Sequence, residues 1–348
     1  HPREVAPLPH PGAVRDFARQ GHLIDLGTYL DIEQLRRDQS PYLISLGTLG
    51  EDGSWPASTG TTYGAFSESN LKSMIWYPMP ELAEAGHQIP RTWNELMALS
   101  DALVREGQTP WCMGWESGNS DGWPGTDWIE LLLLNEAGPE VLDRWVTHEI
   151  PFDSAPVRRA FERLGQILFT DGYVADGTAD RNFAVTQRPM VKKQPPGCWL
   201  YQFPSFATGV VPEGSFGTTT DIFPFPSLGA DARGVLGGGQ IVGAYSDRPE
   251  VRELVRYILS PRYGETVVDL GVGFISANQR FDTTRYGPFE QRQAELIYAA
   301  LADDTFRFDV SDLMPSEIGT DAFWDAMIRF AEEGPESLDS ILAELDAA

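Results

Sequence analysis

Three short segments place aromatic rings beside carboxylates, amides and hydroxyls. They are 116–124 (ESGNSDGWP), 195–202 (PPGCWLYQ) and 306–315 (FRFDVSDLMP). A flat aromatic ring can cover the apolar face of a sugar ring, while acidic and amide side chains hydrogen-bond to its hydroxyls. The first segment precedes a helix that we expect to begin near Thr126, where unpaired backbone N–H groups also face outward. These segments predict contacts to a polyhydroxylated ligand, with core packing as the alternative for each tryptophan.

The signatures of several enzyme classes are missing from the sequence. It contains no G-x-S-x-G, H-E-x-x-H, C-x-x-C or Walker motif. None of its five histidines is paired with another at the spacing of helical metal ligands, so we expect no metal site and no cofactor. Carboxylates are abundant, so a glycoside hydrolase that uses two acidic groups stays open as an alternative.

A glycine triplet at 237–239 is a further candidate for close contact with a ligand. A dinucleotide-binding fingerprint requires a helix after the glycines, whereas a strand pattern at 240–245 follows here. We expect a turn or hinge that brings the backbone close to a ligand, with a plain connecting loop as the alternative.

The elements that position these segments alternate between helices and strands. Thr92 and Glu95 form a capping-box pattern, and Leu96, Leu99 and Leu103 follow on one helical face. Apolar stripes of the same period predict further helices that begin near 156 and 247, and two more over 323–331 and 338–345. Short apolar runs predict strands at 73–77, 111–115, 221–225 and 240–245. This alternation predicts the α/β fold class.

Length and charge limit the classes of protein that remain. A chain of 348 residues exceeds what one hydrophobic core usually organises, which predicts two lobes. The net charge of −25 excludes nucleic acid as a partner, because phosphates demand basic surfaces. No apolar run approaches the length of about 18 residues that a membrane-spanning helix needs. Cys112 and Cys198 permit either one disulfide or two thiols.

In its order of segments the chain resembles the family 1 extracellular solute-binding proteins of bacterial ABC importers. Within that family it is most similar to the α-glucoside receptors, which take maltose, sucrose or trehalose. The segments that carry the resemblance extend over nearly the whole chain and include 9–12 (PHPG), 72–77 (KSMIWY), 90–96 (PRTWNEL), 109–114 (TPWCMG), 122–129 (GWPGTDWI), 195–199 (PPGCW) and 306–315.

The resemblance implies a two-lobed fold of the periplasmic-binding-protein type, with a hinge and a cleft between the lobes. Lobe 1 would take 1–70 and 238–288, and lobe 2 would take 71–237 and 289–348. Relatives begin with further β-α units before the segment that matches 9–12. We therefore expect lobe 1 to lack its first β-α units in this chain.

The resemblance also implies the residues that contact the sugar. Trp123, Trp199 and Trp324 would stack on sugar rings, and carboxylates such as Asp309 would accept hydrogen bonds from hydroxyls. Gly238 would let the backbone approach the ligand. His10 stands where close relatives have glutamine, so its contact departs from the family pattern. The full expected set is His10, Asn70, Lys72, Glu116, Trp123, Trp199, Gln202, Gly238, Gln240, Asp309, Asp312 and Trp324.

A receptor of this kind is not an enzyme, and it delivers its solute to the permease subunits of the importer. We expect an extracellular or periplasmic monomer, exported with or without a lipid anchor. Oxidising conditions there predict a disulfide between Cys112 and Cys198, which both flank segments proposed for the site. The alternatives from other classes are the glycoside hydrolase and a receptor for a non-sugar solute.

Overall fold

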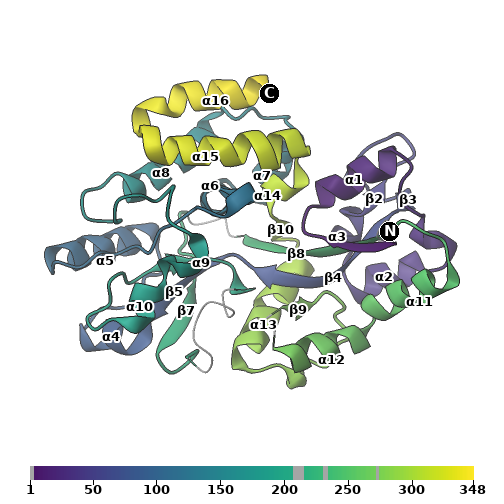
Figure 1. Cartoon of the computed structure of the whole chain (residues 1–348), viewed down its shortest axis with the longest axis horizontal. Coiled ribbons are helices and arrows are strands. Elements are labelled where there is room, and N and C mark those ends of the chain that lie inside the picture. The colour runs from purple at the N-terminus through teal and green to yellow at the C-terminus, as the bar shows by residue number, and fades with distance from the viewer. Residues whose placement is uncertain (1–3, 207–214, 230–233, 272–273) are drawn as a thin grey trace. The chain divides into compact units, whose positions relative to one another are not determined.

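The chain forms two compact units, each made of segments that are distant in the sequence (Figure 1). The computed structural model describes residues 4–206, 215–229, 234–271 and 274–348. Unit 1 comprises His1–Leu71 and Gly237–Phe308, and unit 2 comprises Lys72–Leu236 and Asp309–Ala348. The chain therefore passes from one unit to the other three times.

The third boundary differs from the predicted one. We expected lobe 2 to resume at residue 289, but the structure places 289–308 in unit 1. The reason is that helix α13 (Pro288–Ala302) packs against strands of the unit 1 sheet, and strand β10 (Phe306–Phe308) pairs with one of them. The other two boundaries lie within one residue of the predicted positions.

The main sheet of unit 1 has the strand order β1-β8-β4-β9, with β10 also paired to β8. The strands are β1 (Val5–Leu8), β8 (Val235–Ala244), β4 (Gly64–Leu71) and β9 (Ile275–Ser276), and the pairs β1·β8, β4·β8 and β4·β9 are antiparallel. A second small sheet joins β2 (Thr48–Leu49) and β3 (Thr61–Thr62).

The glycine triplet lies inside β8, so the predicted turn at 237–239 is wrong. Each of its glycines is hydrogen-bonded in register with β4. A Cβ on Gly237 would lie 2.4 Å from the ring of Phe306, and one on Gly239 would lie 2.3 Å from the carbonyl oxygen of Glu68. Gly237 and Gly239 are therefore required by the close packing of β8 against β4 and β10.

Helices complete unit 1. They are α1 (Pro11–Arg19), α2 (Ile32–Asp38), α3 (Pro41–Ser45), α11 (Pro249–Ile258), α12 (Pro261–Leu270) and α13. Val251 and Val255 of α11 share a hydrophobic core with Val242 and Ala244 of β8. Helix α12 packs on β4 and β9.

Unit 2 combines a small sheet with a large helical layer. Its sheet has the order β6-β5-β7, formed by Tyr201–Gln202, Met74–Pro78 and Thr220–Pro224. In Figure 1 the last two helices lie beside α6 and α8, and α15 contacts both α6 and α16. The helices are α4 (Met79–Glu84), α5 (Trp93–Arg105), α6 (Trp123–Ala137), α7 (Pro139–Val146), α8 (Ala155–Leu168), α9 (Phe183–Thr186), α10 (Arg188–Lys192), α14 (Val310–Leu313), α15 (Phe323–Glu333) and α16 (Leu338–Ala347).

Several local predictions are confirmed. Helix α5 carries the reciprocal capping box between Thr92 and Glu95, and α8, α11, α15 and α16 occupy the predicted positions. The disulfide joins Cys112 and Cys198. The strand predicted at 111–115 is wrong, because Trp111 makes only isolated bridges to Val174 and Leu200. Among the described residues, no helix is both long and apolar enough to span a bilayer.

Candidate functional site

The start of helix α6 positions a group of buried polar side chains inside unit 2. The helix begins at Trp123, three residues before the predicted start, because Gly122 serves as its N-cap with a φ of 94°. A Cβ on Gly122 would lie 2.1 Å from the carbonyl oxygen of Trp324, so only glycine fits there. Trp123, Asp127 and Glu130 follow at spacings of four and three residues, which places them on one face of the helix.

Lys72 provides the positive charge at this face. Its Nζ lies 2.7 Å from Oδ1 of Asp127 and also donates to Oδ2 of Asp309. All three side chains are buried. The three residues come from the segment after β4, from α6 and from the residue before α14, so one ammonium joins three separate parts of unit 2.

The α14 segment is held by carboxylates at its amino end. Glu130 accepts hydrogen bonds from the backbone N–H groups of Val310 (2.8 Å) and Ser311 (3.0 Å). Asp309 caps the helix by accepting from the N–H of Asp312 at 3.1 Å, and it also accepts from the hydroxyl of Ser311 at 2.8 Å. These bonds satisfy donors that a helix N-terminus leaves unpaired.

The pKa values of the buried acidic groups in this cluster are shifted in opposite directions. Burial disfavours the charged form of Asp309, but attraction to Lys72 and the hydrogen bonds it accepts hold its pKa below the ordinary value. Burial raises the pKa of Asp127 well above its usual range, and Lys72 offsets this only in part. Burial, with repulsion from Asp309 and Asp127, also raises the pKa of Glu130. Asp309 is therefore the charged partner of Lys72.

Lys72 itself stays protonated. Burial opposes the ammonium charge, but attraction to Asp127, Asp309 and further carboxylates raises the pKa of Lys72 well above its usual value. Carboxylate oxygens of Asp127, Glu130 and Asp309 lie within 4.8 Å of one another and could in principle hold a metal ion. The Lys72 ammonium already bonds to two of these three groups and would repel a metal cation.

An aromatic wall adjoins this cluster. The Trp123 ring is partly exposed and lies 5.4 Å from Nζ of Lys72. It packs against Phe183, Phe203 and Phe206 at ring-centroid distances of 5.4, 5.3 and 6.0 Å. Its Nε1 donates to the hydroxyl of Ser117 at 3.2 Å. These contacts fix the indole in place, and the residue remains partly exposed.

The other predicted residues of unit 2 lie in different environments. Glu116 accepts from the side-chain amide of Asn182 at 2.6 Å and from the N–H of Gly118 at 3.0 Å. Gln202 donates from Nε2 to the carbonyl oxygen of Lys72 at 3.2 Å, which places it beside the cluster.

Trp199 packs in the hydrophobic core of unit 2. Its Nε1 donates to Gln108 at 3.3 Å, and its ring meets that of His87 edge-on. The structure does not bring its ring to the Lys72 cluster, and its packing accounts for it without a ligand.

The Trp324 indole is buried and donates from Nε1 to the hydroxyl of Ser311 at 3.4 Å. Through that hydroxyl it connects to Asp309 and to Thr126, whose Oγ1 lies 3.4 Å away. Asp312 is buried in the first turn of α14. Asp309 and Trp324 therefore meet at the hydroxyl of Ser311, and Asp312 is joined to them through its backbone N–H bond to Asp309.

The remaining predicted residues belong to unit 1. His10 precedes α1 as its N-cap residue, and its side chain does not cap the helix. Asn70 lies directly opposite Gly238 in the β4·β8 pair. Gln240 lies opposite Glu68 in the same pair.

Sequence reasoning missed Asp127, Glu130 and Ser311. The signal for the first two was available: charged side chains at four and seven residues after Trp123 lie in a helix that is buried over most of its length. Ser311 had no comparable signal, since its role depends on contacts with residues that are far away in the sequence.

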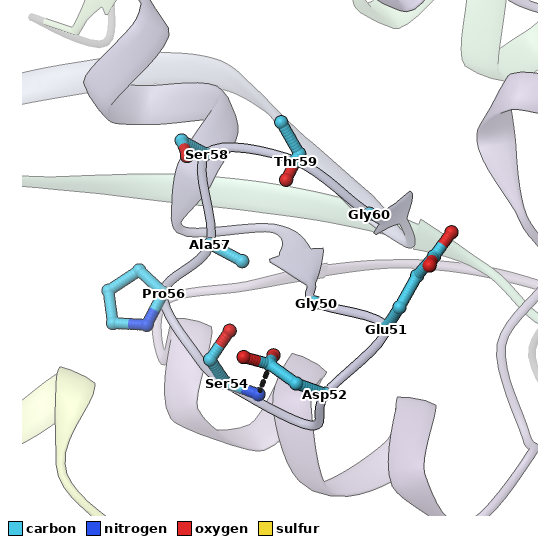
Figure 2. Close-up of a pocket in the computed structure, with 9 residues that line it drawn as sticks. All are labelled: Gly50, Glu51, Asp52, Ser54, Pro56, Ala57, Ser58, Thr59 and Gly60. Carbon is cyan, nitrogen blue, oxygen red and sulfur yellow. Dashed lines mark hydrogen bonds between the residues drawn. The ribbon is translucent and has the colours of Figure 1, made fainter.

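A separate pocket of about 570 Å³ lies in the 50–60 loop of unit 1 (Figure 2). Figure 2 shows Asp52 turned toward the backbone of Ser54, whose N–H donates to its Oδ1 at 2.9 Å. The lining residues are small or acidic and include no aromatic ring: Gly50, Glu51, Asp52, Ser54, Pro56, Ala57, Ser58, Thr59 and Gly60. The Lys72 cluster with Trp123 differs from this pocket, because it combines an aromatic ring with hydrogen-bonding groups.

Comparison with known proteins gives concordant results. Residues 4–265 match the family model of the bacterial extracellular solute-binding proteins. The osmoprotective compounds-binding protein GgtB of Synechocystis is 34% identical over 344 residues, which cover 97% of this chain and 79% of GgtB. The alpha-glucosides-binding periplasmic protein AglE of Rhizobium meliloti is 34% identical over 341 residues, covering 94% of this chain and 72% of AglE.

Solved structures support the fold. A chitin oligosaccharide binding protein superposes with a TM-score of 0.78 at 16% identity, covering 100% of this chain and 83% of the other. The maltose-bound MalE3 of T. maritima gives a TM-score of 0.73 at 17% identity, with 99% and 84% covered. At these identities the likeness concerns the α/β fold of two-lobed binding proteins.

Proposed function

Because this chain belongs to the bacterial extracellular solute-binding proteins and serves as the substrate-binding component of an ABC sugar importer, we propose that its solute is an α-glucoside. The protein acts outside the cytoplasmic membrane, as the family does. It binds the sugar without changing it and delivers it to the permease subunits of the importer.

The proposal depends chiefly on one observation, which is an unsatisfied carboxyl oxygen of Asp127, the residue bonded to the same Lys72 ammonium that lies 5.4 Å from the Trp123 ring. Oδ2 of Asp127 is buried and has no hydrogen-bond partner among the residues that the structure describes, whereas its Oδ1 is bonded to Lys72. A buried polar atom without a partner costs roughly 1 to 3 kcal/mol. A sugar hydroxyl that bonded to Oδ2 would remove this cost, while its ring stacked on Trp123.

The choice of an α-glucoside is supported by the name and the similarity of AglE. The name of GgtB, which is equally similar, favours an osmoprotective solute as a second candidate. An osmoprotectant that is a glycoside would present several hydroxyls to the protein, as an α-glucoside does. We expect the protein to act as a monomer, since a net charge of −25 makes its copies repel one another.

Titration calorimetry with maltose, sucrose and trehalose tests the proposal, with the β-linked cellobiose as a matched control. We expect saturable binding of at least one α-glucoside and weaker or no binding of cellobiose. Asp127→Ala should abolish most of this affinity, whereas Asp127→Asn, which keeps the shape and a hydrogen-bonding group, should retain part of it. Chromatography of the recovered sugar should find it intact. Tighter binding of cellobiose would contradict the α-glucoside assignment, and cleavage would indicate a hydrolase.

A further inference from the structure

Strand β4 contains an irregularity that turns one carboxylate to the opposite face of the unit 1 sheet. Phe66 pairs with Ile241 and Glu68 pairs with Gln240, so Ser67 is an extra residue between two successive pairs. Without this β-bulge, Glu68 would share the face of Phe66, which is fully buried and packs against Phe308. The bulge places Glu68 on the other face, and such bulges commonly re-aim a side chain next to a binding site.

Glu68 is then on the same face as three other polar positions. Asn70 follows two residues later on β4, and Gln240 lies directly opposite Glu68 on β8. Tyr263 belongs to α12, which packs on β4, and its pKa is raised by burial and then by the charge of Glu68. We call Glu68, Asn70, Gln240 and Tyr263 the β4 polar patch. Gly238, opposite Asn70, adds no side chain to it.

One member of the β4 polar patch, Asn70, lacks a hydrogen bond that its burial demands. Asn70 is 5% exposed, and its Oδ1 has no hydrogen-bond partner within the described part of the chain. Glu68 is also buried, at 9% exposed. Burial raises the pKa of Glu68 to about 7, so near neutral pH its carboxyl can both donate and accept.

The geometry points to Glu68 as a solute contact that determines specificity: its carboxyl, together with Asn70, binds hydroxyl groups of the glycoside at the β4 polar patch. The inference rests on the proposed function and adds a residue of unit 1 that the sequence did not single out. A sugar hydroxyl can accept a hydrogen bond from the protonated carboxyl and donate one to the ionised carboxyl. It can therefore bond to Glu68 in both protonation states. Tyr263 adds a partly exposed ring and a hydroxyl to the same patch.

A structural role and a binding role for Glu68 predict opposite effects of Glu68→Leu. Leucine has a similar volume and no polar atoms, so it removes a carboxyl whose charged form burial disfavours and should leave thermal stability unchanged or higher. The same change should weaken α-glucoside binding about tenfold or more, as the loss of one good hydrogen bond implies. Glu68→Gln should bind within a few-fold of the parent. Glu265→Gln, an exposed charge-matched control on α12, should change neither property.

Calorimetry on these variants with the α-glucoside that the parent binds best decides the question. If the folded Glu68→Leu protein binds with the parent's affinity, the inference is wrong and the proposed function stands. If the parent binds no α-glucoside, the proposed function and this inference both fail. Should Glu68→Leu not fold, carbodiimide labelling of the parent replaces it: the sugar should protect Glu68 from modification, and equal labelling with and without sugar would overturn the inference.

Discussion

Nζ of Lys72 lies 2.7 Å from Oδ1 of Asp127, and the two residues are 55 positions apart in the chain. Lys72 is the first residue of unit 2, and Asp127 lies in the first half of α6. Asp309 is the first residue of the second unit 2 segment and also bonds to Lys72. The three side chains thus connect the starts of both unit 2 segments to α6, the most buried helix of that unit. The Lys72–Asp309 ion pair and the Lys72–Asp127 hydrogen bond therefore connect these segments and position the candidate site.

Removing the charge of Asp309 should destabilise the protein strongly. Asp309→Asn leaves the buried Lys72 ammonium without its charged partner, and breaking a buried pair costs about 3 to 5 kcal/mol. Urea denaturation followed by tryptophan fluorescence measures the free energy of unfolding. Asp321→Asn, at an exposed position of the same unit, serves as the control and should unfold like the parent. An unchanged midpoint for Asp309→Asn would show that the ion pair contributes little.

Two tryptophans should separate binding from stability. Trp123→Ala should weaken sugar binding by roughly 1 to 3 kcal/mol, as for other aromatic anchors, and should lower stability less because the ring is partly exposed. Trp199→Ala should cost about 3 to 5 kcal/mol of stability, because that ring is 5% exposed within the core. Calorimetry and thermal unfolding on both variants measure the two quantities. The reverse pattern would assign Trp199 to the site and Trp123 to packing.

Reduction of the disulfide should lower the melting temperature. The bond between Cys112 and Cys198 spans 86 positions, and loop closure of that length corresponds to about 4 to 5 kcal/mol in the chain-entropy model. Differential scanning calorimetry with and without dithiothreitol measures the effect. The double variant Cys112→Ser and Cys198→Ser should melt near the reduced parent and be insensitive to the reductant. A parent that melts identically under both conditions would contradict this prediction.

Stability should fall as the pH rises through neutrality, and Glu68 should account for part of the fall. Its pKa is about 7 in the folded protein against an ordinary value of 4.5, so the folded state binds more protons between these values. The contribution is fully present below pH 4.5 and is lost as the pH rises through 7, at about 3 kcal/mol in total. Urea unfolding at pH 5 and pH 8 measures it. Glu68→Gln should show a smaller decrease, and an equal decrease in both proteins would exclude Glu68 as its source.

Local patterns predicted the elements of this protein well, while long-range contacts escaped them. The capping box at Thr92 and Glu95 gave the start of α5 because all its bonds lie within four residues. The start of α6 was placed too late because the fit of Gly122 depends on Trp324, which is distant in the sequence. The glycine triplet had the composition of a turn. Gly237 and Gly239 are needed in β8 because they lack side chains, and not because they can adopt unusual φ and ψ angles.

The same limit applies to the candidate site. Lys72, Trp123, Asp309 and Trp324 were predicted through the family resemblance, and the structure gathers them around Asp127 and Ser311. Trp199 was predicted by the same route and packs in the core. A tryptophan near a polar loop has the same local sequence in either case, and only tertiary packing distinguishes the two.

The three passages of the chain between its units affect the order in which the protein can be made. Strand β4 ends at Leu71, but its partners β8 and β9 begin only at Val235 and Ile275. Synthesis of Lys72–Leu236 takes on the order of 10 to 30 s at ~5–20 residues per second, and both edges of β4 remain unpaired during that time. An unpaired strand edge is a template for aggregation, and charged or polar side chains reduce that hazard. Glu68 and Asn70 thus also make the nascent strand a poor partner for other chains before β8 emerges from the ribosome.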